Sequence, residues 1–301
     1  MTRADRLGAF AVAVGAPLLL SACVVRVESS DYTTREEKRF AVSGTPQVTL
    51  ATFDGSIAVR AWDRPEVLVE VEKAGDVKEQ VDAISVVAEQ EGDRIRVEVR
   101  EPGRGDWASG VFAGGSRRAR LTASVPRACN LLVRSGDGAV EAERLRGRVE
   151  LRTGDGSVRA IDLDGDLHVE TGDGSVKLQD VNGRIDVTSG GGSIFASGRL
   201  RLVTVRTNDG TVSLTAGPGS AMDGAWDISA GDGSVVVALP EGFDADIDAS
   251  TGDGIVRLDD ALAATGAEAG GDRRALRARI GKGTHAIRIH SNDGSIKIRK
   301  Q

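Results

Sequence analysis

The chain is poor in aromatic residues, proline, cysteine and histidine. Of its 301 residues, 3% are aromatic, seven are proline, three are histidine and two are cysteine. So few large rings disfavour a core of aromatic side chains, and the bias toward glycine, valine and isoleucine indicates many short strands with small inward side chains. The 39 basic and 45 acidic residues leave a net charge of −6. Because this composition offers no basic surface for nucleic acid, we predict no nucleic-acid partner.

Glycine, in contrast, is abundant, and it recurs in one phrase. The phrase Thr-Gly-Asp-Gly-Ser-Val is complete at residues 153–158 and 171–176 and varied elsewhere. Its closing glycine returns every 18 residues at Gly138, Gly156, Gly174, Gly192 and Gly210. The step then lengthens to 23, 21 and 40 residues. A fixed period of this kind is typical of stacked repeats.

Apolar and polar residues alternate on both sides of each turn, as in half-buried strands. In one unit Val149 and Leu151 precede the Gly-Asp-Gly turn, and Val158 and Ala160 follow it. Glycine permits a positive φ at such corners, and aspartate bonds its own turn. Two architectures fit: an antiparallel meander of hairpins, or a parallel β-solenoid with equivalent residues stacked about 4.8 Å apart. The recurrence of one residue type at one phase favours the solenoid.

We therefore predict an all-β fold, a single-domain parallel β-solenoid of roughly nine coils with 18-residue repeats. It occupies residues 39–301, with a less regular β part at 39–134 and regular repeats at 135–301. Outward charges agree with this register, because Glu141 falls beside Arg159 and Arg152 beside Glu170.

Three further details of the solenoid are predicted from its irregular positions. Trp226 falls at the position in the repeat that Val149 occupies, so its side chain is expected in the core. Each unit has a second corner, with glycine at Gly147, Gly165 and Gly183, and Arg201 replaces the glycine at this corner in a later unit. The last coil carries Lys297, Arg299 and Lys300, and these charges suit the exposed end of a stack. A helical turn or two is expected within 76–84.

The first 22 residues resemble a lipoprotein signal peptide. Arg3 and Arg6 precede an apolar stretch at 7–20 that is too short for a comfortable membrane span. It ends in Leu-Ser-Ala-Cys, which resembles the bacterial lipobox, so we predict lipid attachment at Cys23. Attachment through more than one acyl chain anchors a protein stably to the membrane. Residues 23–38 are expected to form a flexible tether; the alternative is an ordinary signal peptide cleaved near Ala22.

No catalytic residue, cofactor or metal site is predicted. The three histidines lack metal-ligand spacing, and there is no nucleophile elbow or phosphate loop. Cys129 lies between two apolar alternations and is expected to be a small buried side chain. The recurring candidates are the turn aspartates: Asp137, Asp155, Asp173, Asp209, Asp232 and Asp253. Stacked carboxylates repel one another unless they bond turn amides or a cation intervenes, so turn chemistry and weak cation binding are both open.

The repeated unit Ser/Thr-Gly-Asp-Gly-Ser/Ala-Val/Ile resembles the bacterial putative-adhesin family of β-strand-repeat proteins. Phrases at 54–63, 121–126 and 291–298 fit as well, and the likeness covers residues 40 to 301. Insertions at 102–116 and 216–224 depart from the plain repeat. The resemblance implies an exported or lipid-anchored β-solenoid, and it brings no catalytic residues.

The sequence thus predicts a non-enzymatic lipoprotein of the cell envelope, in the periplasm or at the cell surface. Its repetitive surface is expected to have an adhesin-like role, with an envelope protein or a glycan as partner. Two alternatives remain open. One is a polysaccharide-acting enzyme that uses carboxylates such as Asp166 or Asp186, and the other is a structural or signalling partner of an envelope protein.

Overall fold

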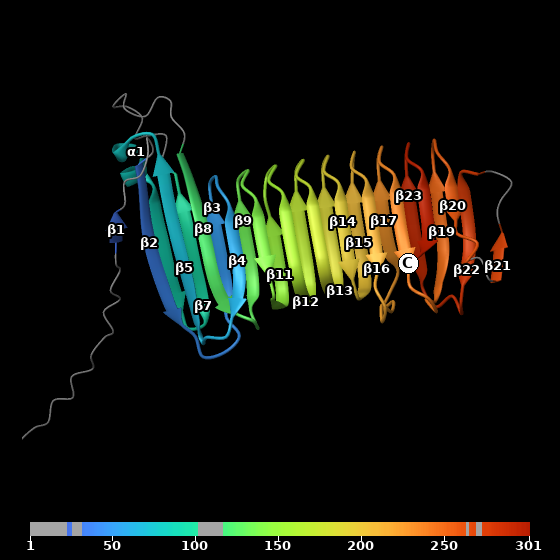
Figure 1. Ribbon diagram of the computed structural model, residues 1–301, viewed down its shortest axis with the longest axis horizontal. Coiled ribbons are helices and arrows are strands. Elements are labelled where there is room, and N and C mark those ends of the chain that lie inside the picture. Colours follow the sequence, from blue (N-terminus) through green and yellow to red (C-terminus); the bar gives the residue numbers. More distant parts are fainter. Residues whose placement is uncertain (1–22, 26–31, 102–116, 263–264, 269–272) are drawn as a thin grey trace, which may run out of the picture.

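In a computed structural model the chain forms a long β-solenoid, as predicted (Figure 1). The structure describes residues 23–25, 32–101, 117–262, 265–268 and 273–301. Its repeat is set by β12 (Val158–Thr171) and β13 (Val176–Ser189), which pair in parallel with Val158 opposite Val176. The 18-residue register is therefore confirmed, and the antiparallel meander is wrong for the repeats.

Each coil has two strands, one on each face of a flattened rod. On one face lie β7 (Arg94–Arg100), β3 (Gln47–Thr52), β9 (Asn130–Ser135), β11 (Arg146–Arg152), β15 (Leu200–Thr207), β17 (Trp226–Ala230), β23 (Ala286–Ser291) and β19 (Ala245–Thr251). On the other lie β8 (Arg117–Pro126), β4 (Ile57–Trp62), β10 (Val140–Glu143), β14 (Ile194–Gly198), β16 (Val212–Ala216), β18 (Val235–Leu239), β24 (Ile296–Lys300) and β20 (Val256–Leu258).

Strands β12 and β13 run through the second corner and so contribute to both faces. The backbone of β12 turns there with a positive φ at Asp162 (52°) and at Gly165 (133°). Gly147 and Gly183 have the same conformation in the neighbouring coils, with φ of 135° and 131°. Glycine is needed at this corner because other residues enter the left-handed region only at a cost.

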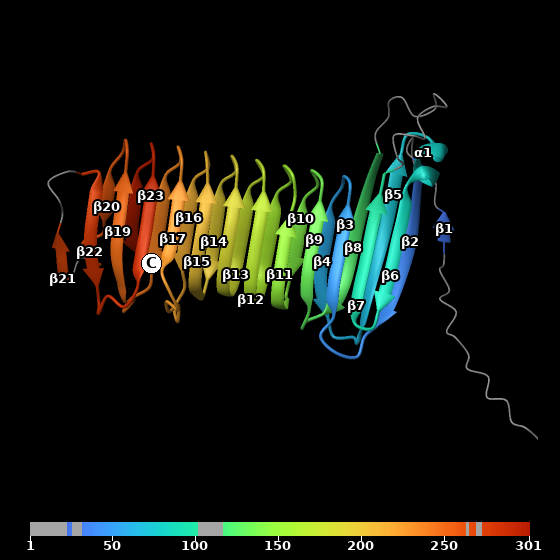
Figure 2. The ribbon, with the colours of Figure 1, turned by 180° about the vertical axis from the view of Figure 1, so that it is seen from behind.

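The coils do not stack in the order of the chain. In the described ranges the order is β7/β8, β3/β4, β9/β10, β11/β12, β12/β13, β13/β14, β15/β16, β17/β18, β23/β24 and β19/β20. Both views show β3 and β4 beside β8 and β9, and β23 between β17 and β19 (Figures 1 and 2). The prediction that the last coil ends the stack is wrong, because β24 lies between β18 and β20, with Lys297 opposite Val236 on one side and Arg257 on the other.

Antiparallel strands cover both ends of the rod. At the first end β2 (Tyr32–Ala41) pairs with β5 (Glu66–Gly75), β5 with β8, and β6 (Ser85–Glu91) with β7. Helix α1 (Lys78–Ala83) lies between β5 and β6, so the predicted helical turn is confirmed. At the other end β22 (Ala275–Ile280) pairs with β19, and β21 (Thr265–Glu268) with β22. These strands cover the open edges of β7, β8 and β19.

The predicted tether at 23–38 is wrong for most of its length. Residues 32–38 belong to β2, which pairs with β5 from Tyr32 to Ala41, and β1 (Cys23–Val25) pairs antiparallel with β2. A polar sequence can form this strand because its inward Lys73–Glu36 contact, with 2.7 Å between Nζ and Oε1, replaces an apolar pair. The predicted signal peptide at 1–22 and the insertion at 102–116 lie outside the described residues.

The core is one continuous ladder of valine, isoleucine and leucine side chains. Trp226 is fully buried, as predicted, and its Nε1 donates to the carbonyl oxygen of Arg201 over 3.1 Å. Its ring lies tilted against Phe243, with 5.4 Å between the centroids. Cys129 is fully buried too, and this burial raises the pKa of its thiol to about 12. The thiol therefore stays protonated and acts as a small apolar side chain.

Candidate functional site

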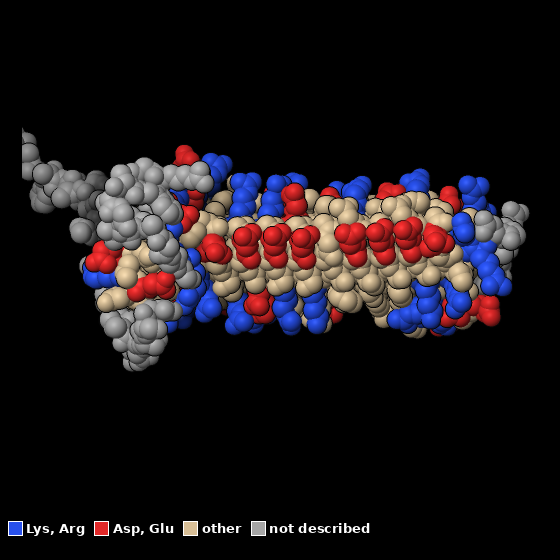
Figure 3. Space-filling model, turned by 90° about the horizontal axis from the view of Figure 1, so that it is seen from above, with Lys and Arg blue, Asp and Glu red and all other residues tan. Residues whose placement is uncertain are grey.

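The turn aspartates form a straight row along one edge of the rod (Figure 3). We call it the aspartate row, and its exposed members in stacking order are Asp54, Asp137, Asp155, Asp173, Asp209, Asp232, Asp293 and Asp253. Gly191 replaces the aspartate in one coil and interrupts the row. The turns are joined coil to coil through their backbones; for example, the amide of Asp232 donates to the carbonyl oxygen of Asn208 over 2.8 Å.

Buried hydroxyl groups lock these turns together. The hydroxyl of Thr153 lies 2.8 Å from the carbonyl oxygen of Gly138 and 3.1 Å from that of Gly136, both in the preceding coil. Ser291 makes the same two contacts, to Gly231 and Gly233, at 3.3 and 3.0 Å. The first residue of the repeated phrase is thus a buried donor between coils.

The glycines of this turn are required by close approach. Gly55, after Asp54, has a positive φ of 123°, but Gly154 and Gly156 do not, so the expectation that the Gly-Asp-Gly turn needs a positive φ is wrong for these two glycines. A Cβ on Gly156 would lie 2.1 Å from the carbonyl oxygen of Gly138. A Cβ on Gly154 would meet Oδ1 of Asp137. Asp137 and Asp155 therefore pack over the first glycine of the next coil, Gly154 and Gly172.

The carboxylates of the row face water. At a spacing of about 4.8 Å, repulsion between neighbouring charges amounts to about 1 kcal/mol in water and is screened further by salt. The amide of Asp173 donates weakly to Asp155, over 3.4 Å. No group of three or more acidic, histidine or cysteine side chains among the described residues has the geometry to hold a metal ion. The row therefore serves the turns, and whether it also attracts diffuse cations remains a prediction.

A groove opens at the opposite edge of the rod, at the second corner. We call it the Arg184 groove; its volume is about 490 Å³ and its charged lining is Arg184, Arg199, Arg201, Asp164, Asp166 and Asp223. It lies where the repeat loses its register, because Gly183 pairs with Leu200 and Arg184 with Leu202. Arg201 is the extra residue of this bulge, so the prediction that Arg201 replaces the corner glycine is wrong and Leu200 holds that place. Bulges redirect side chains and are frequent at functional sites.

The insertion between β16 and β17 forms one wall of the groove. Its Ser220 hydroxyl donates to the carbonyl oxygen of Gly217 over 2.7 Å, and the amide of Asp223 donates to that of Arg201 over 3.0 Å. Nε and Nη2 of Arg201 donate to Oδ2 and Oδ1 of Asp223, each over 2.6 Å. These bonds lower the pKa of the Asp223 carboxyl. They also fix the inserted loop to β15 through Arg201.

A second hollow, of about 550 Å³, lies on the face formed by β15, β17, β23 and β19. In it the Nδ1 of His290 lies 3.1 Å from the Ser250 hydroxyl, and its Nε2 lies 3.2 Å from Oδ1 of Asn292. Both imidazole nitrogens are therefore engaged by neutral groups. Arg288 lies beside this pair in sequence and contacts Asp227 at 3.3 Å.

The predicted charge columns are present. His168 lies between Glu150 and Asp186 in the register, with 3.4 Å between its Nδ1 and the Asp186 carboxylate. Arg152 contacts Glu170 at 3.4 Å. The enzyme alternative named Asp166 and Asp186 as candidate carboxylates. Asp166 lines the Arg184 groove, whereas Asp186 does not line it and is paired with His168.

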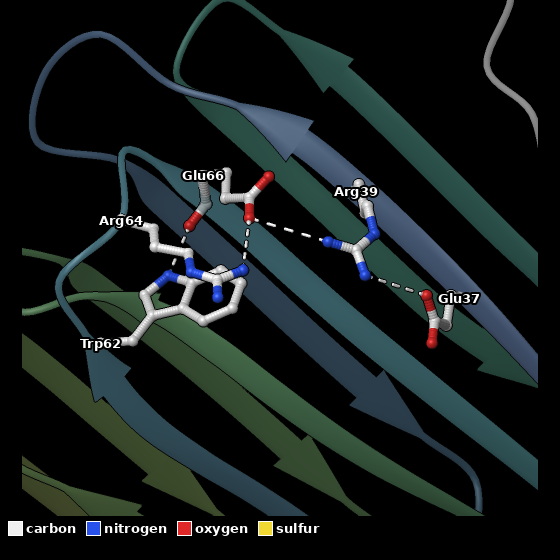
Figure 4. Close-up of polar contacts among 5 residues, drawn as sticks. All are labelled: Glu37, Arg39, Trp62, Arg64 and Glu66. Atoms are coloured by element: carbon white, nitrogen blue, oxygen red, sulfur yellow. Dashed lines mark hydrogen bonds and ion pairs between the residues drawn. The ribbon is translucent and has the colours of Figure 1, made fainter.

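A half-buried tryptophan on β4 forms a polar cluster with β2 and β5 (Figure 4). The Nε1 of Trp62 donates to the carbonyl oxygen of Glu66 over 2.8 Å, and the Arg64 guanidinium lies 4.9 Å from the ring centroid. The Glu66 carboxylate in turn contacts Arg64 at 3.6 Å and Arg39 at 3.7 Å. The ring face under Arg64 is therefore covered by a cation and is not open to a stacked sugar.

For Cys23 the structure gives only a backbone position, opposite Glu36 in the β1–β2 pair. Lipid attachment there remains a prediction. Within the described part of the chain, no helix has the length and apolarity needed to cross a bilayer.

The Arg184 groove was not among the predicted sites. The sequence signals for it are the missing corner glycine near Arg201 and the insertion at 216–224, both of which interrupt the period. Neither signal shows that the bulge at Arg201 and the insertion at 216–224 meet in space. They meet because the bulge lies in β15, the insertion leads into β17, and β15 and β17 are paired neighbours.

A model of the family described as Toastrack DUF4097 matches residues 43–299. Three solved structures are similar. A putative cell adhesion protein from Clostridium sporogenes is 15% identical with a TM-score of 0.32, over 89% of this chain and 100% of that chain. A putative adhesin from Bacteroides fragilis is 12% identical with a TM-score of 0.39, over 90% and 98%. A putative adhesin from Parabacteroides distasonis is 10% identical with a TM-score of 0.32, over 87% and 96%. No protein of curated function matches the sequence.

Proposed function

Because the chain belongs to the Toastrack DUF4097 family, we propose that it is a non-enzymatic, lipid-anchored protein of the cell envelope with an adhesin-like binding role. The observation that carries this proposal is the stacking register. Outward side chains of the same phase lie on neighbouring strands, as Arg159 and Lys177 do across β12 and β13. A rod of this kind can offer groups of one charge at a constant spacing.

A constant spacing suits a partner that is itself repetitive. Each coil contributes a weak contact, and contacts along one rigid rod add without a new ordering cost for each of them. Exposed residues on the same face include Phe195, whose side chain is 48% accessible beside Lys177. An aromatic ring beside cationic columns suits a polymer such as a glycan or an extended envelope protein.

The position of β1 supports an anchor at one end of the rod. β1 pairs with β2, the outer strand of the first end, and Cys23 is the first residue of β1. A diacylated Cys23 would hold this end at the membrane and leave the coils to extend away from it. Both the aspartate row and the Arg184 groove would then remain accessible along the sides.

Metabolic labelling with a fatty-acid analogue tests the anchor. The wild-type chain should carry the label and sediment with membranes, and Cys23→Ala should lose both properties. Cys129→Ala is the matched control, because it removes the other cysteine and should stay labelled. An unlabelled wild-type chain, or a labelled Cys23→Ala variant, contradicts the lipoprotein assignment.

Crosslinking on intact cells followed by membrane extraction tests the binding role. We expect recovery of a specific envelope protein or glycan at a level that exceeds recovery with a Cys23→Ala chain released from the envelope. Recovery of nothing above that background contradicts an adhesin-like role.

A second candidate function is polysaccharide cleavage, which one observation favours. Asp164, Asp166 and Asp223 line the same groove, and glycoside hydrolysis uses paired carboxyl groups. Incubation with envelope polysaccharide and a reducing-end assay separates the candidates. Release of reducing ends that is lost in Asp166→Asn would replace the binding proposal with an enzymatic one.

A further inference from the structure

We propose that the Arg184 groove binds an acidic sugar, a uronate unit of a polysaccharide, through the guanidinium groups of Arg184 and Arg199. The inference rests on the proposed binding role and names the chemistry of one partner. The volume of the Arg184 groove, about 490 Å³, lies in the range of small-ligand sites.

Two of the three arginines in the groove have no ion-pair partner among the described residues. Arg184 is exposed, and its guanidinium makes no hydrogen bond or ion pair with the described part of the chain. Arg199 is exposed too, and its Nε donates to the amide oxygen of Asn182 over 3.1 Å. Guanidinium groups match the planar geometry of a carboxylate and bind it through paired hydrogen bonds.

The third arginine serves the wall. Arg201 is held by Asp223 through two hydrogen bonds of 2.6 Å. This pair ties the inserted loop to the bulge and fixes the shape of the groove before any ligand arrives. A preformed site loses less entropy on binding than a site that must be ordered.

The carboxylates of the groove decide between kinds of anion. Asp164 and Asp166 line the same cavity as Arg184 and Arg199, and their carboxylates accept hydrogen bonds from hydroxyl groups but repel a ligand that presents only anionic oxygens. A nucleic acid or polyphosphate is therefore disfavoured. A uronate carries one carboxylate on a ring of hydroxyl groups, and aspartate oxygens accept hydrogen bonds from such hydroxyls.

The groove also lies on a rod along which an extended chain can run. Asp164, Asn182 and Arg199 come from successive coils at the second corner, and Asp166, Arg184 and Leu202 form the adjacent column. A polysaccharide laid along these columns would meet one polar side chain per coil. The bulge at Arg201 and the inserted loop end this run on one side.

Calorimetric titration of the full chain in detergent with oligogalacturonate tests the inference. We expect measurable binding that is lost when the carboxylates of the same oligosaccharide are methyl-esterified, and no binding of neutral maltooligosaccharide. Arg184→Gln and Arg199→Gln should each lower the affinity about tenfold, because each removes charge-assisted hydrogen bonds. Arg134→Gln is the matched control, since it removes an exposed arginine of β9 that does not line the groove, and it should bind like the wild type.

Three outcomes would overturn the proposal: no binding of oligogalacturonate, equal binding of its methyl ester, or unchanged affinity in both groove variants. Tighter binding of polyphosphate would overturn the charge argument. The crosslinking experiment on cells is independent of these results. If it still recovers an envelope partner, the binding role stands and only the groove assignment fails.

Discussion

Thr171 donates its hydroxyl hydrogen to the carbonyl oxygen of Gly156 in the preceding coil, over 2.9 Å. The same hydroxyl lies 3.3 Å from the carbonyl oxygen of Gly154. Ser189 repeats the arrangement one coil later, toward Gly172 and Gly174. The hydroxyl and the glycines of the repeated phrase are therefore parts of one joint, which is why they recur together.

Replacing this hydroxyl should weaken the joint. Thr171→Val keeps the shape of the side chain and removes the donor, so we expect a loss of about 1 to 2 kcal/mol in the free energy of unfolding. Urea unfolding followed by circular dichroism measures it. Thr188→Val is the control, because Thr188 points outward from β13 and should change stability by less than about 0.5 kcal/mol. Equal effects of the two substitutions would contradict the role of the hydroxyl.

Two glycines separate close approach from backbone strain. Gly156→Ala should cost about 3 kcal/mol or more, because its Cβ would lie 2.1 Å from the carbonyl oxygen of Gly138. Gly92→Ala meets open space and bears only the strain of its φ of +59°, which costs about 1 kcal/mol. Thermal unfolding of both variants should rank them in this order, and the reverse ranking would refute the packing explanation.

Cys129 should be inert in the folded protein. Burial raises the pKa of its thiol from 9.0 to about 12, so the protonated form is favoured by folding. This contribution to stability is fully present below pH 9.0 and is lost as the pH rises toward 12. Iodoacetamide at mildly alkaline pH should leave Cys129 unmodified by peptide mass spectrometry until a denaturant is added. Ser157→Cys, at an exposed turn, is the positive control for labelling, and rapid native labelling of Cys129 would contradict its burial.

Acid should weaken the first end of the rod through Glu98. Hydrogen bonds from Arg100 and Arg96, at 2.9 and 2.7 Å, lower the pKa of this carboxyl from 4.5 to about 2. The ionised form is favoured by folding, so the contribution is present above pH 4.5 and is lost as the pH falls toward 2. Glu98→Gln should flatten the pH dependence of the unfolding midpoint in this window. Glu79→Gln, on the exposed side of α1, should retain the wild-type slope, and a wild-type slope in Glu98→Gln would reject the assignment.

The sequence specifies the regular coils well because one period sets every contact within them. Val158 and Val176 fall at the same phase, and the structure pairs them. The period does not specify the order in which the coils stack. The inward residues of β4, such as Ile57 and Val59, could pack against equivalent inward residues of any other coil. In the structure Ile57 lies between Leu121 and Val140, a choice that local alternation does not encode.

The groove could not be predicted for a related reason. One extra residue at a corner, here Arg201, leaves the alternation on either side intact, so its place in the register shows only when strands are paired. The contact between Arg201 and Asp223 likewise depends on where an inserted loop folds back. The aspartate row, in contrast, follows directly from the period, and its alignment in the structure agrees with the predicted turn.

The intercalated coil β23/β24 also dictates an order of assembly. Residues 245–258 are joined to the rest of the rod through residues 286–300, since β23 and β24 lie between them and β17 and β18. The far end must therefore nucleate across a chain separation much longer than one repeat, which slows its formation relative to coils that add in sequence. Once formed, the last coil of the chain is covered on both sides, so it can fray only after the β19/β20 coil has been released.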